Sequence, residues 1–75
     1  MRVTEMLQGM AVVVVSHQPN ATITLHRDDE ADSGQAYWVS VYEGRGEPYT
    51  SEPNGQSFDN AMFDFVAAVR FEEVQ

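Results

Sequence analysis

The densest group of chemically active side chains is the run Asp28-Asp29-Glu30-Ala31-Asp32-Ser33-Gly34. Alternate oxygen ligands ahead of a glycine are typical of the start of a calcium-binding loop. In such a loop the glycine stands one position earlier than Gly34, and a bidentate glutamate stands where this chain has Val39. The run therefore predicts a solvated loop between two strands. The functional alternative is an acidic contact loop that meets arginines or lysines of a partner.

Histidine and serine could carry out metal or nucleophilic chemistry, but their pattern favours neither. The chain has no cysteine, and His17 and His26 are its two histidines, so no spacing resembles a zinc or iron site. Ser40, His26 and Asp28 could form a Ser-His-Asp constellation, yet a triad is recognised by its geometry and not by the presence of these residues. A chain of 75 residues also has little room for a deep pocket. We expect no enzyme, no metal and no cofactor.

Aromatic residues in the middle of the chain suggest a binding surface. Trp38, Tyr42 and Tyr49 would suit the stacking of nucleic-acid bases if basic residues surrounded them. Their neighbours are instead acidic, with Glu43 and Glu47 among them. The sequence therefore predicts a protein partner, with aromatic anchors and a charged rim, and no direct binding of DNA or RNA.

The net charge points to the same class of partner. Twelve acidic residues stand against four arginines, lysine is absent, and the net charge is −8 at pH 7. Such a field repels nucleic acid and anionic membranes and steers the protein towards basic surfaces. The alternative is that the acidity only keeps a small protein soluble. No signal peptide is readable, and the apolar run 10–15 is too short to span a bilayer, so we expect a cytoplasmic protein without a membrane anchor.

The last third of the chain predicts a helix over residues 57–72. Ser57 is a good N-cap, and Asp59 lies in the first turn, where the helix dipole favours negative charge. One apolar face of this helix comprises Phe58, Ala61, Met62, Phe65 and Val69. A second stripe lies nearly opposite and comprises Phe63, Ala67 and Phe71. Either the N-terminal segment or the chain end at Val74 covers this stripe, or it is a dimer or partner interface.

The middle of the chain predicts antiparallel strands. Residues 21–26 and 37–42 alternate apolar and polar positions and are rich in β-branched and aromatic side chains. Residues 47–51 predict a short third strand, which Pro48 confines to an edge. The pleat places one set of side chains towards the C-terminal helix, namely Ile23, Leu25, Tyr37, Val39 and Val41. The outer face would then show Thr22, Thr24, His26, Trp38, Ser40 and Tyr42.

The first sixteen residues allow two interpretations. We favour a short helix over residues 3–9, with Thr4 as a possible cap, followed by a strand over residues 10–16, because the run Val12-Val13-Val14-Val15 is β-branched. The alternative continues the helix through Val14 and gives the order helix, three strands, helix. That order resembles the layout of the double-stranded-RNA-binding domain. The family has a lysine-rich motif at the start of its last helix, where this chain has Ser57-Phe58-Asp59-Asn60-Ala61, so its RNA-binding residues are not carried over.

Together these patterns predict one α+β domain over residues 1–75. It has a small antiparallel sheet of three to four strands, a C-terminal helix packed on one face and a short N-terminal helix or strand. The leading hypothesis is a small acidic inhibitor that imitates nucleic acid and blocks the basic groove of a nucleic-acid-handling complex, by analogy with anti-CRISPR and anti-restriction proteins of phages. The alternative is a self-associating, antitoxin-like regulatory or assembly module, and hence a homodimer. The predicted partner-binding residues are Asp28, Asp29, Glu30, Asp32, Trp38, Tyr42, Glu43, Glu47, Phe63 and Phe71.

Overall fold

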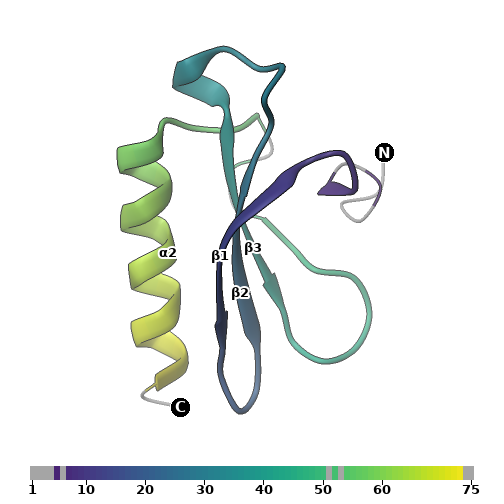
Figure 1. Cartoon of the computed structure of the whole chain (residues 1–75). Helices are drawn as coiled ribbons and strands as arrows, with labels where there is room; N and C mark the ends of the chain where they lie inside the picture. The colour runs from purple at the N-terminus through teal and green to yellow at the C-terminus, as the bar shows by residue number, and fades with distance from the viewer. Residues whose placement is uncertain (1–4, 6, 51, 53, 74–75) are drawn as a thin grey trace.

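The computed structural model places one long helix against one face of a three-stranded sheet (Figure 1). It describes residues 5, 7–50, 52 and 54–73. The elements are β1 (Ala11–His17), β2 (Thr22–Arg27), the short 3-10 helix η1 (Ser33–Gln35), β3 (Tyr37–Tyr42) and α2 (Phe58–Glu73). Both strand pairs are antiparallel and the order is β1-β2-β3, so each strand pairs with the next along the chain. The predicted α+β architecture is confirmed.

The β-branched run near the N-terminus forms a strand. Val12, Val13, Val14 and Val15 all lie in β1, so the alternative that continues a helix through Val14 is wrong. β-branched side chains lose rotamer freedom in a helix and pack well on a pleated surface. A bulge between Val12 and Val14 interrupts the pairing with β2. Before the strand, Glu5 and Leu7 are helical, and the proposed cap Thr4 lies outside the described residues.

The prediction of a strand over residues 47–51 is wrong in its extent. In residues 47–50 the chain makes only one β-bridge to the sheet, in which Tyr49 and Val41 exchange two backbone hydrogen bonds of 2.9 and 3.0 Å. A second bridge joins Tyr37 to Gln56. Pro48 has no N–H group to donate to a ladder, which limits pairing beside Tyr49.

The helix begins where its cap predicts. The Ser57 Oγ accepts a hydrogen bond of 3.3 Å from the Asn60 backbone N–H, which satisfies one of the free donors of the first turn. Asp59 and Arg70 lie at the ends of α2 that favour their charges. The helix therefore spans one residue beyond the predicted range at its C-terminal end and begins one residue later, with Ser57 as its cap.

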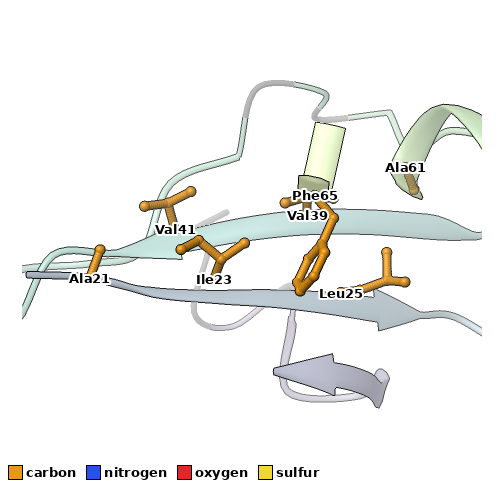
Figure 2. Packing of buried hydrophobic residues seen from close by; sticks show 7 residues of the cluster. All are labelled: Ala21, Ile23, Leu25, Val39, Val41, Ala61 and Phe65. Carbon is orange, nitrogen blue, oxygen red and sulfur yellow. The ribbon is translucent and has the colours of Figure 1, made fainter. Parts of the chain in front are cut away.

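The core lies between α2 and the strands β2 and β3 (Figure 2). Ile23 and Leu25 of β2 are fully buried, and Phe65 of α2 points from the helix towards them. Burying one such side chain stabilises a fold by roughly 1.5–3 kcal/mol. The full buried cluster is Ala21, Ile23, Leu25, Val39, Val41, Ala61 and Phe65. The predicted assignment of side chains to this face of the sheet agrees with that cluster.

The part of the opposite face around Trp38 is covered, which corrects the expectation that Trp38 and His26 are exposed there, whereas Tyr42 is exposed as expected. Trp38 is only 6% exposed, and His26 and Ser40 are also buried. The six-membered ring of Trp38 packs against Gly55, which has a φ angle of 81°. In Figure 1 residues 7–10, which precede β1, also lie on the side of the sheet away from α2, and Leu7 is buried.

Candidate functional site

The acidic run forms a structured end to the β2–β3 hairpin. The Asp28 N–H donates to the Ala36 carbonyl at 2.8 Å, which closes the hairpin beyond the last strand pair. The Asp28 Oδ1 accepts a hydrogen bond of 3.0 Å from the Glu30 backbone N–H, and the Ala31 N–H donates to the Asp28 carbonyl. These bonds form a turn of the kind that aspartate favours. The loop thus presents its remaining carboxylates, Asp29, Glu30 and Asp32, to solvent.

One carboxylate of the hairpin end has a cationic partner. Arg27 Nε lies 2.8 Å from Asp29 Oδ1, and both side chains are exposed. The Asp29 carboxylate and a hydrogen bond with the Tyr37 side chain raise the pKa of Arg27 above its usual value. Such an exposed pair contributes little to stability. Within the described part of the chain, Glu30 and Asp32 make no ion pair, so the hairpin end keeps a net negative charge.

The six predicted acidic contacts do not form one surface. One group precedes β3 in the chain and comprises Asp28, Asp29, Glu30 and Asp32. The other group follows β3 and comprises Glu43 and Glu47. Six strand residues separate the two groups, a length of about 20 Å. Figure 1 shows the two loops at opposite ends of β3. A single partner groove would have to span the sheet to contact both groups.

The predicted aromatic anchors are also divided. Trp38 and Tyr42 lie on the face away from α2, but Trp38 is buried and Tyr42 is exposed. Tyr49 pairs directly with Val41, and residues opposite each other in an antiparallel pair point to the same face. Tyr49 therefore lies on the α2 face, and the three aromatic residues form no common stacking platform.

Of the three residues that could form a triad, His26 and Ser40 are in contact, and Asp28 is not part of the arrangement. His26 Nε2 and Ser40 Oγ share a hydrogen bond of 2.8 Å in a buried setting. His26 Nδ1 is buried and has no partner among the described residues, and the Asp28 carboxylate bonds to its own turn instead. Burial lowers the pKa of His26. A triad needs a group that orients the imidazole at its second nitrogen, so the arrangement is a buried polar pair of the far face.

The second helical stripe is uncovered in the structure. Phe63 is 76% exposed and Phe71 is 61% exposed, and Ala67 between them is exposed as well. The described residues of the N-terminal segment do not cover the stripe, and Val74 lies outside the described residues. Exposed aromatic side chains at helical spacing form an apolar surface of the kind that marks contact sites.

A groove between the C-terminal half of α2 and the outer edge of β3 was not predicted. Its volume is about 210 Å³. Val39 and Val41 form its floor, and Tyr49 stands at the β3 edge. The helix contributes Asp64, Ala68, Phe71 and Glu72. The spacing of Asp64, Ala68 and Glu72 by four residues places them on one strip of the helix, but the sequence does not show which element lies opposite that strip.

Electrostatics at the groove are governed by carboxylates. Partial burial raises the pKa of the Tyr49 hydroxyl, and the negative charges of Glu43 and Glu72 raise it further. Glu43 of the predicted set therefore lies within electrostatic range of the groove. Among the described residues no three His, Asp or Glu side chains form a cluster that could hold a metal ion. No described helix has the length and apolar character needed to cross a membrane.

No known protein family, curated protein or solved structure matches this chain significantly.

Proposed function

We propose that this protein is a non-enzymatic binding module that uses its acidic hairpin end to occupy a basic groove of a nucleic-acid-handling protein. The observation that carries the proposal is the set of four carboxylates on one closed hairpin, of which Asp29 alone has a cationic partner among the described residues. Carboxylates held at a hairpin end can imitate phosphates and form charge-assisted hydrogen bonds with arginine.

The overall charge supports this choice of partner. With a net charge of −8 and no lysine, the protein repels nucleic acid and is attracted to the surfaces that nucleic acid occupies. The separation of Glu43 and Glu47 from the hairpin end limits the primary contact to Asp28, Asp29, Glu30 and Asp32. Binding is electrostatic and weakens as salt screens the exposed charges.

The test is a quadruple variant in which Asp28, Asp29 and Asp32 become Asn and Glu30 becomes Gln. The asparagine introduced by Asp28→Asn keeps the side-chain oxygen that accepts the Glu30 N–H, so the turn is retained. We expect the variant to lose salt-sensitive capture of basic proteins from lysate. We also expect it to lose the ability to compete with duplex DNA for these proteins. A matched control neutralises four acidic residues elsewhere, Glu5, Glu52, Asp59 and Glu73. Equal binding by the hairpin variant and the wild type would contradict the proposal.

A second candidate function is self-association through the outward stripe of α2. The specific observation is the exposure of Phe63, the most exposed large apolar side chain among the described residues. Substitution Phe63→Ser would then shift a dimer to monomer in sedimentation at micromolar concentration. A wild-type protein that is monomeric up to about 100 μM would contradict an antitoxin-like or assembly role for this face.

A further inference from the structure

The groove beside α2 combines an apolar floor with acidic ends. Val39 and Val41 are almost completely buried beneath it, and Ala68 lies midway along its helical wall. Asp64 and Glu72 lie four residues to either side of Ala68. Eight residues of helix span about 12 Å, so the two carboxylates stand about that far apart along the axis with an apolar gap between them.

The dimensions suit an extended polypeptide. In a strand, residues i and i+4 are about 13 Å apart and point to the same side, with residue i+2 between them. A segment that places cationic side chains at i and i+4 would reach both carboxylates, while its central side chain would lie over Ala68 and the valine floor. Burial of this central side chain and the two charge-assisted contacts would together stabilise the bound segment.

The aromatic residues favour arginine as the cation. Tyr49 and Phe71 both line the groove and are largely exposed. A planar guanidinium can stack on an aromatic ring while it bonds to a carboxylate, whereas an ammonium group remains strongly hydrated. Phosphate-bearing ligands are disfavoured because Asp64, Glu72 and the nearby Glu43 surround the site with negative charge.

We propose that this groove binds an extended segment of a partner protein with the pattern Arg-x-apolar-x-Arg. The arginines pair with Asp64 and Glu72, and the apolar side chain occupies the gap above Ala68. The occupant is not a second copy of this chain, because its four arginines, Arg2, Arg27, Arg45 and Arg70, include no pair four residues apart. The site is separate from the acidic hairpin end and does not rest on the function proposed for it.

The experiment is an NMR titration of the ¹⁵N-labelled protein with the capped peptide Gly-Arg-Ser-Leu-Ser-Arg-Gly. We expect the largest amide shifts at Val39, Val41, Tyr49 and Ala68. The double variant Asp64→Asn/Glu72→Gln should bind about tenfold more weakly, since it removes two exposed charge pairs. A second peptide with Ser in place of Leu should also bind more weakly, because it lacks the apolar contact.

A matched variant separates this site from the general charge of the protein. Asp59→Asn/Glu73→Gln removes the same two charges from the same helix, but neither residue lines the groove. Its affinity for the peptide should remain within about twofold of the wild type, and so should that of the quadruple hairpin variant. The amide spectrum of each variant shows whether it is folded.

Three outcomes would overturn the proposal. The first is no shift at millimolar peptide. The second is an equal loss of affinity in the two double variants, which would show attraction to the net charge alone. The third is equal binding of the Leu and Ser peptides, which would remove the apolar gap from recognition. If the hairpin variant loses its basic partners yet binds the peptide normally, the two sites act separately.

Discussion

Of the neighbouring strands β1 and β2, β1 is the more hydrophobic, yet β2 is the more deeply buried. β1 has the sequence AVVVVSH, and its four valines are 39–58% exposed. β2 has the sequence TITLHR and contains Ile23 and Leu25, both completely buried. The apolar content of a strand therefore does not decide whether it is covered; the elements packed on it do.

The width of α2 explains the difference on the face of the sheet that the helix covers. A helix with its side chains is about 10–12 Å across, and neighbouring strands lie about 4.8 Å apart, so one helix covers about two strands. In this fold those strands are β2 and β3. β1 lies beyond the helix at the edge of the sheet, and the bulge near Val13 bends it out of regular pairing.

The largest expected effect lies in the covered half. Substitution Leu25→Ala removes a fully buried side chain from the cluster under α2. We expect a loss of about 2–5 kcal/mol in the free energy of unfolding, because transfer and cavity terms add. For a domain of this size that is a large part of the total stability. Urea denaturation followed by circular dichroism measures it, and a loss below about 1 kcal/mol would contradict the burial of β2.

The covering of the far face can be tested at Gly55. Its φ angle is positive, and an added Cβ would meet the Gln35 carbonyl oxygen and lie 2.7–2.8 Å from Trp38 ring carbons. We expect Gly55→Ala to cost about 2–4 kcal/mol from backbone strain and overpacking. Trp38 fluorescence should shift to longer wavelength as the ring becomes exposed. Gly44→Ala is the matched control, since Gly44 also has positive φ but has open space around it.

Leu25 and Gly55 illustrate what could be predicted from the sequence and what could not. The alternation in 37–42 predicted β3 with its observed bounds, and Ser57 predicted the start of α2, because both signals are local. The sequence pattern also assigned Trp38 to the correct face. It could not show that Gly55 packs on that ring, because the contact depends on a loop whose path is set by two isolated bridges. The groove was missed for the same reason, since Asp64 and Glu72 face an edge that no local pattern defines.

Mild acid should weaken the far face through His26. Burial lowers the pKa of His26 in the folded state below the usual value of 6.5. The unfolded chain therefore binds a proton more readily, and stability is full above pH 6.5 and falls as the pH drops through that value towards the folded pKa. In the protonated ring Nδ1 would be a buried donor without an acceptor among the described residues.

The measurement for His26 is the urea midpoint between pH 7.5 and 5.5. We expect the wild type to lose stability over this range, and His26→Gln to lose much less of it. The matched control His17→Gln changes an exposed histidine and should behave as the wild type does. An identical pH dependence in all three proteins would show that His26 is not the group responsible.

The smallest expected effect tests the comparison of strands most directly, because the same substitution can be made in a covered strand and in an exposed strand. Val→Thr keeps the shape of the side chain and adds a hydroxyl, which costs about 1–3 kcal/mol where it is buried without a partner. We expect that loss for Val39→Thr under α2, and a change within about 0.5 kcal/mol for Val13→Thr on β1. Thermal denaturation at 10 μM and 500 μM measures both. If Val13→Thr destabilised the protein only at the higher concentration, β1 would be covered by another copy in solution, and the exposed edge strand would be an interface.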